Sequence, residues 1–209
     1  MGIYTIKKPC TGITVAVWEI SESLKQLSEI VDLTEVEKAT LNSFGYESRK
    51  TQWLASRALT QEVIGKKSKI AYLNSGKPYL LNNELEISIS HSGKFVSLIT
   101  NENSACGIDI EKISTKIEKV KHKFLHPSEH ELIASNNQLE NLCIIWGAKE
   151  SLYKMNGATS LNFSQEIIVK SLKKADQGEL TASIIKNGRS QDFVLDYEKI
   201  EDFILVNTL

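Results

Sequence analysis

The spacing of apolar and polar residues predicts two long helices of equal length. Residues 47–64 carry apolar side chains at helical intervals with no Pro or Gly among them, and Gly65 follows as a typical helix C-cap. Residues 138–155 show the strongest helical pattern in the chain, which ends at Asn156-Gly157.

Shorter helices are indicated by capping signals. Thr34 with Glu37 forms a capping box, and Ser128 with Glu131 forms another just after Pro127, a favourable first helical residue. A further helical stretch is predicted for residues 117–125.

Period-two alternation and short apolar runs predict strands before and after the long helices. The predicted strands are residues 14–18, 86–90, 95–99, 105–111, 163–169, 180–185, 193–195 and 203–206. Short turns, one of them His91-Ser92-Gly93-Lys94, separate the second, third and fourth, so an antiparallel meander is expected there. The order favours an α+β fold of two similar halves packed side by side, residues 1–104 and 105–209.

Composition narrows the functional classes. The 209 residues include 25 Lys and Arg against 26 Asp and Glu, and this balance argues against a general nucleic-acid-binding protein. The three cysteines are far apart and form no CxxC pair, which indicates a reducing, cytoplasmic compartment. No apolar run approaches the length of about 20 residues that spans a bilayer, so no membrane association is expected.

Two carboxylates share one face of a predicted strand. Side chains two positions apart on a strand point the same way, so Asp109 and Glu111 would point together while Ile108 and Ile110 enter the core. Paired oxygen donors suit Mg²⁺, which usually shares its site with substrate phosphates. Solvated acids on an exposed strand are the alternative reading.

A second cluster lies on the helix predicted for residues 138–155. Trp146, Glu150 and Lys154 follow one another at intervals of four and share a helix face. Either Glu150 and Lys154 form a surface ion pair, or Glu150 serves as a third Mg²⁺ ligand or a base while Lys154 neutralises phosphate charge.

Further cations could hold a phosphorylated ligand. Ser90 and His91 lie at a predicted turn, where they could bind a phosphate, and Lys77 precedes Pro78. Upstream candidates are Arg49, Lys50 and Arg57. A solvated turn and solubilising cations are the alternatives. The series His122, His126 and His130 is set aside as a metal site, because Pro127 interrupts the helix it would require.

In order and spacing, four motifs resemble the 4′-phosphopantetheinyl transferase superfamily, in its pseudo-dimeric surfactin-synthetase-activating type. They are Gly76-Lys77-Pro78, Ser88-Ile89-Ser90-His91-Ser92, Gly107-Ile108-Asp109-Ile110-Glu111 and Trp146-Gly147-Ala148-Lys149-Glu150-Ser151-Leu152-Tyr153-Lys154. The last two lie about 40 residues apart and are specific as a pair, and the likeness runs from about residue 47 to residue 169.

This resemblance implies an enzyme that transfers 4′-phosphopantetheine from coenzyme A to a serine of an apo acyl or peptidyl carrier protein and releases 3′,5′-ADP. It implies an active site between the two halves. It further implies that Mg²⁺ is held by Asp109, Glu111 and Glu150, and that Glu150 takes the proton of the carrier serine, directly or through a water molecule.

The resemblance also assigns the coenzyme A contacts. Ser90 and His91 would contact the nucleotide, Lys77 would line the cleft, and Lys154 would lie on the reacting phosphate. Of the upstream cations, Arg57 is favoured as the reader of the coenzyme A phosphates. Lysines that could meet an acidic carrier helix, or simply form a solvated face, are Lys116, Lys119, Lys121 and Lys123.

Two other functions stay open at this point. Acidic residues with a lysine also suit a Mg²⁺-dependent phosphodiesterase or nuclease, although the net charge of −1 argues against it. A non-catalytic protein that binds coenzyme A is the third possibility. The two-half architecture leads us to expect a cytoplasmic monomer with its site built internally.

Overall fold

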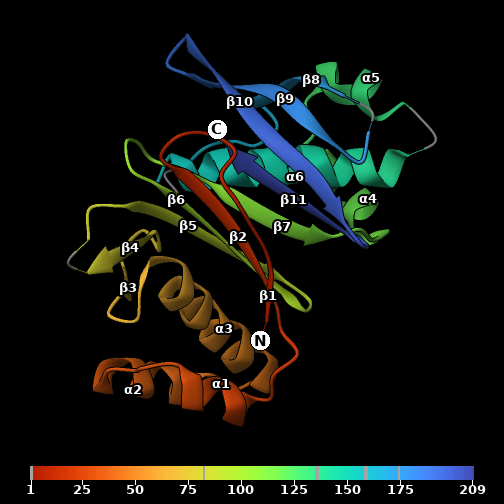
Figure 1. Cartoon of the computed structure of the whole chain (residues 1–209). Helices are drawn as coiled ribbons and strands as arrows, with labels where there is room; N and C mark the ends of the chain where they lie inside the picture. The colour runs from red at the N-terminus through yellow and green to blue at the C-terminus, as the bar shows by residue number, and fades with distance from the viewer. Residues whose placement is uncertain (1, 82, 135–136, 158–159, 174) are drawn as a thin grey trace.

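Two antiparallel sheets, each covered by a long helix, make up the computed structural model (Figure 1). It describes residues 2–81, 83–134, 137–157, 160–173 and 175–209. The first sheet has the order β1-β2-β6-β5 and the second the order β7-β11-β10-β9-β8. A separate hairpin is formed by β3 and β4. The predicted α+β class is confirmed.

The first half of the chain contributes the first sheet, the hairpin and three helices. Its strands are β1 (Ile3–Lys7), β2 (Ile13–Glu19), β3 (Lys69–Tyr72), β4 (Pro78–Leu81), β5 (Glu86–Ser92) and β6 (Phe95–Asn101). Its helices are α1 (Leu24–Ile30), α2 (Glu35–Ser43) and α3 (Glu47–Ile64).

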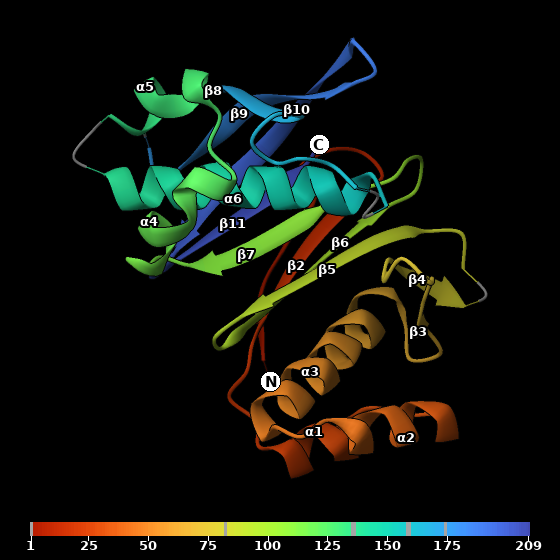
Figure 2. The same ribbon diagram turned by 180° about the vertical axis from the view of Figure 1, so that it is seen from behind.

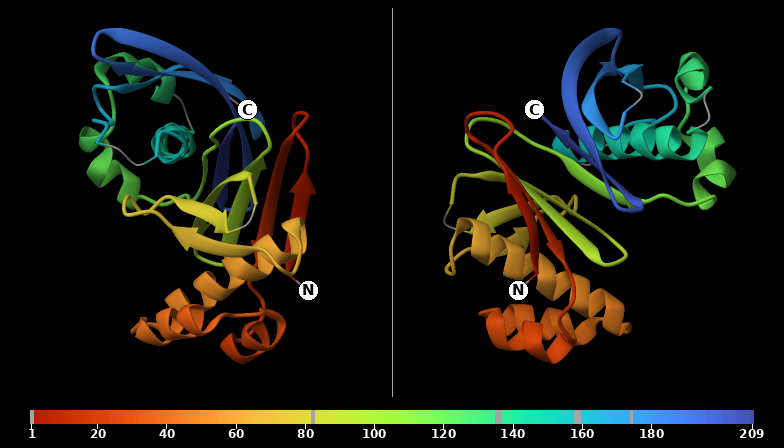
Figure 3. Two further views of the ribbon diagram at one scale, coloured as in Figure 1. Left: turned by 90° about the vertical axis from the view of Figure 1, so that its left-hand side faces the viewer. Right: turned by 45° about the vertical axis from the view of Figure 1, so that its right-hand side comes forward.

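The second half contributes the second sheet and a helical layer. Its strands are β7 (Ile108–Lys112), β8 (Ile167–Leu172), β9 (Gln177–Lys186), β10 (Arg189–Ile200) and β11 (Phe203–Thr208). Its helical segments are α4 (Lys116–Val120), η1 (Lys121–Lys123), η2 (Pro127–Glu129), α5 (His130–Ile133) and α6 (Gln138–Met155). The left panel of Figure 3 views α6 end-on, with the curved second sheet wrapped around it.

Local signals place the helices where the sequence predicts them. The two long helices have the predicted bounds, and Gly65 ends α3 with a positive φ of 131° that favours glycine. Thr34 caps α2 through the predicted box with Glu37. After Pro127 the box differs: His126 and Glu129 form it in place of Ser128 and Glu131, because the first turn there is a 3₁₀ helix that starts at Pro127.

The predicted meander is wrong at its third strand. β5 and β6 form a hairpin, but β7 pairs with β11 of the second sheet. The side chain of Asn101 accepts backbone hydrogen bonds from Asn103 (2.8 Å) and Ser104 (3.2 Å), which ends β6 in a turn. The chain then crosses to the other sheet.

Several other boundaries differ from their predictions, and β10 in particular runs from Arg189 to Ile200 where only 193–195 was predicted. His91 lies inside β5, and the turn that follows β5 consists of Gly93-Lys94. β8 begins at Ile167, four residues later than expected, because a turn at Asn162 precedes it. The side chain of Asn162 accepts a hydrogen bond from the backbone N–H of Ser164, and its carbonyl accepts one from the backbone N–H of Glu166.

Three apolar clusters stabilise this arrangement. One lies between the first sheet and α3, a second between the second sheet and α6, and the third joins the facing sides of the two sheets. Figure 2 shows α3 and α6 on the outer sides of the two sheets. The two halves therefore share a core as well as having their own.

The strand order of the two sheets is similar at the centre. In the first, β2 lies beside β6 and then β5; in the second, β7 lies beside β11 and then β10. In both cases the early strand pairs with the last strand of its sheet. The boundary at residues 104 and 105 and the pseudo-dimer stay predictions. In the part of the chain that the structure describes, no helix combines the length and apolarity needed to cross a membrane.

Candidate active site

The two sheets meet where β5 runs beside β7, and three alternate serines of β5 bridge them. These residues, called the serine seam below, are Ser88, Ser90 and Ser92. The first accepts a hydrogen bond from the backbone N–H of Ile108 (3.3 Å), and the third accepts one from that of Lys112 (3.2 Å). The middle hydroxyl donates to Oδ1 of Asp109 (2.7 Å). The seam thus sets the position of β7 and its carboxylates.

Lys154 reaches the same carboxylate from the last turn of α6. Its Nζ donates to Oδ1 of Asp109 (2.7 Å), to Oγ of Ser90 (2.9 Å) and to the carbonyl of Ile108 (3.0 Å). The other oxygen of Asp109, Oδ2, is buried and has no hydrogen-bond partner. A buried carboxylate oxygen without a donor is a strong acceptor available to a ligand.

Two glycines allow α6 to approach the sheet this closely. A Cβ on Gly107 would lie 1.8 Å from the carbonyl oxygen of Ser151, and one on Gly147 would lie 2.8 Å from a methyl group of Val206. Neither approach tolerates a side chain. The helix face with Glu150 and Lys154 therefore lies directly over β7 and β11.

Glu111 and Glu150 are half-buried beside Asp109. Burial, followed by the charge of Asp109, raises the pKa of Glu111 above its usual value. Burial, with the charges of Asp109 and Glu111, raises the pKa of Glu150 to about 7, although Lys154 acts in the opposite direction. The three predicted carboxylates are therefore near enough to interact electrostatically.

The donor chemistry fits a divalent cation that shares its coordination with a substrate. Oxygen donors suit Mg²⁺, which is usually bound by one or two carboxylates plus substrate phosphates. The unpartnered Oδ2 of Asp109 is such a donor. Within the described residues no three His, Cys, Asp or Glu side chains are close enough together to hold a metal ion by themselves. The ammonium of Lys154 lies against Asp109 instead.

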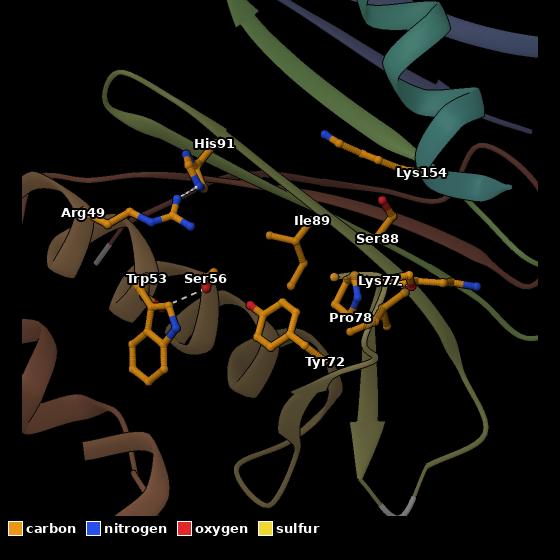
Figure 4. A pocket seen from close by; sticks show the side chains of 13 residues that line it. Arg49, Trp53, Ser56, Tyr72, Lys77, Pro78, Ser88, Ile89, His91 and Lys154 are labelled. Atoms are coloured by element: carbon orange, nitrogen blue, oxygen red, sulfur yellow. Dashed lines mark hydrogen bonds between the residues drawn. The ribbon is translucent and has the colours of Figure 1, made fainter. Parts of the chain in front are cut away.

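A cavity of about 220 Å³ opens beside the seam, between α3 and β5 (Figure 4). Arg49 and His91 meet at one side of it, joined by a hydrogen bond, and Lys154 enters from α6 on the side opposite α3. Lys77 also lines the cavity and forms an ion pair with Glu86 (2.7 Å). Apolar walls come from Trp53, Tyr72, Pro78, Ile87 and Ile89. The cavity combines cations with flat apolar surfaces.

His91 is the acceptor in its contact with Arg49. A guanidinium only donates hydrogen bonds, so Nε2 of His91 must be unprotonated to accept one from Nη1 of Arg49. Burial lowers the pKa of His91, and the positive charges of Arg49 and Lys154 lower it further. An anion placed beside these groups would offset the positive charges of Arg49 and Lys154 and so favour protonation of His91.

Arg57, the favoured phosphate reader, does not line this cavity. Its side chain is 3% exposed, pairs with Oε1 of Glu37 (3.2 Å), and stacks on Trp53 with its Cζ 3.2 Å from the ring centroid. It ties α2 to α3. Arg49, about two helical turns earlier, takes the position in the cavity, and Lys50 does not line it.

Lys149 has a role that the sequence analysis missed. Its buried ammonium donates to Oε2 of Glu129 (2.8 Å) and to the carbonyls of Phe124 (2.7 Å) and Phe163 (2.8 Å). Glu129 in turn accepts from the backbone N–H of Val169 (2.7 Å). Its position in the sequence could have indicated burial, because Lys149 falls on the same helix face as the buried residues Leu142, Ile145 and Leu152.

Lys149 thereby anchors the backbone of Phe124 and Phe163, which line a second hollow next to Glu150. The hollow measures about 360 Å³, and its lining includes Lys123, Phe124, Trp146, Glu150 and Phe163. The ring of Trp146 packs on those of Phe124 and Phe163, with centroids 5.1 and 5.6 Å apart. Glu150 therefore lies between the charged groups beside the serine seam, which are Asp109 and Lys154, and this aromatic hollow.

Comparisons with known proteins give a consistent picture. Residues 105–206 match the model of the 4′-phosphopantetheinyl transferase superfamily. The 4′-phosphopantetheinyl transferase AcpT of Escherichia coli K12 is 28% identical over 118 residues, covering 54% of this chain and 60% of that protein. The 4′-phosphopantetheinyl transferase gsp of Aneurinibacillus migulanus is 31% identical over 118 residues, 49% of each chain.

A putative 4′-phosphopantetheinyl transferase of Haemophilus influenzae is 34% identical over 99 residues, 43% of this chain and 41% of that protein. The chain thus spans 60% or less of the length of these curated relatives. The similarity includes the strand with Asp109 and Glu111 and the helix with Glu150 and Lys154.

Proposed function

We propose that this chain, whose residues 105–206 match the model of the 4′-phosphopantetheinyl transferase superfamily, transfers 4′-phosphopantetheine from coenzyme A to a serine of an apo acyl or peptidyl carrier protein. We expect it to act as a cytoplasmic monomer. The observation that carries the proposal is the meeting of Asp109, Glu111, Glu150 and Lys154 beside a cation-lined cavity.

The cavity beside the serine seam is the site proposed for the nucleotide of coenzyme A. Arg49 and His91 would hold its 3′-phosphate, since the anion would accept from Arg49 and would favour a protonated His91 that also donates to it. Lys77 lines the same cavity, and the flat surfaces of Trp53 and Tyr72 suit an aromatic base. This assignment moves the predicted role of Arg57 to Arg49.

Lys154 would hold the pyrophosphate where the cavity meets the carboxylates. Its ammonium lies between Asp109 and Ser90, and its side chain lines the cavity, so it is available to a phosphate oxygen bound there. Asp109, Glu111 and Glu150 would hold a divalent cation, with Mg²⁺ proposed. That cation would supply charge neutralisation for the pyrophosphate and for the departing 3′,5′-ADP.

Glu150 is proposed to accept the proton of the carrier serine, directly or through one water molecule. Without a bound cation the pKa of Glu150 is raised to about 7, and a nearby cation would lower it and keep the carboxylate ready to accept a proton at neutral pH. The serine oxygen forms a bond to the phosphorus that bears pantetheine, and the bond from that phosphorus to 3′,5′-ADP breaks. The protein supplies alignment and charge neutralisation for this exchange.

The test is the intact mass of an apo carrier protein after incubation with this protein, coenzyme A and MgCl₂. We expect a gain of one phosphopantetheine group, and loss of that gain when EDTA is present. Fatty-acid, polyketide and peptidyl carriers are tested in parallel. Coenzyme A binding without transfer to any of them would contradict the proposal and favour a non-catalytic binding protein.

Glu150→Gln tests the proton acceptor. The variant keeps the size of the side chain but cannot take a proton, so we expect transfer to slow by about 10²- to 10⁴-fold while coenzyme A still binds. Glu131→Gln, the same change at an exposed residue of α5, is the matched control and should transfer at the normal rate. Normal transfer by Glu150→Gln would rule out this role.

A further inference from the structure

The ammonium of Lys154 lies among oxygen atoms of the kind that hold a cation. Its three N–H bonds each have an oxygen acceptor, namely Oδ1 of Asp109 (2.7 Å), Oγ of Ser90 (2.9 Å) and the carbonyl of Ile108 (3.0 Å). Carboxylate and carbonyl oxygens are also the ligands that hard divalent cations prefer. The ammonium therefore occupies a position on Asp109 that suits a cation.

Asp109 is not fully available to a divalent cation while Lys154 stays there. Its second oxygen, Oδ2, is buried and has no hydrogen-bond partner. A cation bound to this oxygen would share one carboxylate with the ammonium, and two positive charges repel each other strongly at so short a distance. The side chain of Asp109 is 7% exposed, so solvent ions screen this repulsion little. Lys154 and a cation therefore compete for Asp109.

Neighbouring side chains do not remove this competition. In the ranges that the structure describes, no three His, Cys, Asp or Glu side chains lie close enough together to bind a metal ion without other ligands. A cation at this place depends on Asp109 and would take further oxygen ligands from a bound phosphate. Binding of the cation is therefore tied both to Lys154 and to the occupant of the cavity.

Lys154 is placed to leave Asp109 for a phosphate. It lies in the last turn of α6, its side chain is 26% exposed, and it lines the cavity together with Arg49 and His91 (Figure 4). Lys149, on the same helix, differs because it is fully buried in its ion pair with Glu129. A phosphate bound in the cavity offers the ammonium of Lys154 a second anionic partner.

We propose that Lys154 occupies Asp109 in the free protein in place of a divalent cation, and that coenzyme A frees Asp109 by drawing the ammonium to its phosphates. The cation and coenzyme A then bind cooperatively, because whichever binds first breaks the ion pair that the other would have to break. The identity of the phosphate ligand rests on the proposed function. The competition between Lys154 and the cation does not.

Mn²⁺ binding to the protein alone tests the competition. Electron paramagnetic resonance measures free Mn²⁺ and gives its affinity without any substrate. Lys154→Met removes the ammonium and keeps most of the apolar stem, so we expect Mn²⁺ to bind this variant about tenfold or more tightly than it binds the original protein. An unchanged Mn²⁺ affinity in Lys154→Met overturns the proposal.

Two further variants separate the contact with Asp109 from a general effect of charge. Lys112→Met is the matched control, because it also removes one ammonium from the end of β7, but that ammonium is exposed and pairs with Asp202 (3.0 Å). Its Mn²⁺ affinity should stay within about twofold of the original value. Lys154→Arg keeps a positive charge for Asp109 and should bind Mn²⁺ as weakly as the original protein. Equal tightening in Lys112→Met and Lys154→Met, or tight binding by Lys154→Arg, overturns the proposal.

Coenzyme A tests the cooperativity in the original protein, so this measurement does not depend on the folding of a variant. Mn²⁺ affinities measured with and without saturating coenzyme A, corrected for Mn²⁺ bound by coenzyme A in solution, should differ about tenfold or more. The same factor should appear in the affinity for coenzyme A when Mn²⁺ is added, and it should shrink in Lys154→Met. Coenzyme A that binds without changing the Mn²⁺ affinity overturns the proposal.

The outcomes separate this inference from the proposed function. Failure of coenzyme A to bind, with or without Mn²⁺, would contradict the proposed function, and the Mn²⁺ affinities of Lys154→Met and Lys112→Met would still decide the competition for Asp109. Cooperative binding without transfer to any carrier protein would support the inference and contradict the proposed function.

Discussion

The carboxylates of the candidate site differ in how far their negative charge is compensated by neighbouring groups. Asp109 shares one oxygen between Lys154 and Ser90 and leaves the other without a partner. Glu150 has no comparable compensation, since burial and two neighbouring carboxylates outweigh Lys154 and raise its pKa to about 7. Holding this residue ready for a cation or a proton therefore costs folding stability.

The pH dependence of stability should reveal this cost. Below pH 4.5 Glu150 is protonated in both states, but between pH 4.5 and about 7 the folded state holds the proton more tightly. The free energy of unfolding therefore falls as pH rises through this window. Glu150→Gln removes this contribution, so the variant should become more stable relative to the original protein from pH 4.5 to 7.

Urea denaturation in metal-free buffer at several pH values measures this difference. Glu131→Gln, at an exposed position, should follow the original protein throughout. A difference between Glu150→Gln and the original protein that stays constant from pH 4 to pH 8 would show that the carboxyl is not destabilised in the folded state.

At the scale of the elements, the contact between β5 and β7 depends on side chains. These strands belong to different sheets, and the serine seam replaces the backbone ladder that would otherwise join them. Ser92 has two partners, since its hydroxyl accepts from the backbone N–H of Lys112 and donates to Oε1 of Glu111 (3.5 Å). A change at the seam should therefore affect stability and transfer together.

Ser92→Ala tests this connection. Loss of the Lys112 bond should lower the free energy of unfolding by about 0.5–1.5 kcal/mol. It should also slow transfer, because Glu111 loses one of its supports, and Ser92→Thr should restore part of the rate. Urea denaturation and the carrier-mass assay measure the two effects. Ser28→Ala, at an exposed position of α1, is the control; an equal loss of rate there would dismiss the seam as a positioning element.

Across the whole molecule, the two halves are joined by an apolar layer between the sheets. Phe95 of β6 and Phe203 of β11 meet edge to face with ring centroids 5.0 Å apart, and both are buried. The same cluster includes Val15 and Val17 from β2, and Ile108 from β7. Neither half can expose this face to water without losing apolar burial, so the halves should unfold together.

Phe203→Ala should destabilise both halves. Removing a buried ring from a core costs about 3–5 kcal/mol, and here the cavity borders both sheets. Hydrogen exchange followed by mass spectrometry should show faster opening in peptides from residues 13–19 as well as 203–208. Val194→Ala, an exposed change on β10, should leave both unaffected. Faster exchange in the second half alone would mean that the halves are independent.

Local sequence patterns are sufficient to predict the class of the fold and its two long helices. The bounds of α3 and α6 follow from apolar spacing and from residues that end helices, such as Gly65. These signals involve only neighbouring residues, so they act wherever the segment lies in the fold. The resemblance is confirmed over residues 105–206, which match the model of the superfamily. Strand alternation and helical spacing single out Asp109, Glu111, Glu150 and Lys154, and the resemblance assigns their roles.

The tertiary structure decided what depends on distant partners. Three features join segments that lie 20 or more residues apart in the sequence. They are the pairing of β7 with β11, the ion pair of Arg57 with Glu37, and the ion pair of Lys149 with Glu129. The sequence around Arg49 and Arg57 is compatible with either residue facing the cavity. The choice is made by packing, since Arg57 is enclosed by α2 and Trp53 while Arg49 meets His91 from another strand, and no periodicity along one helix encodes such contacts.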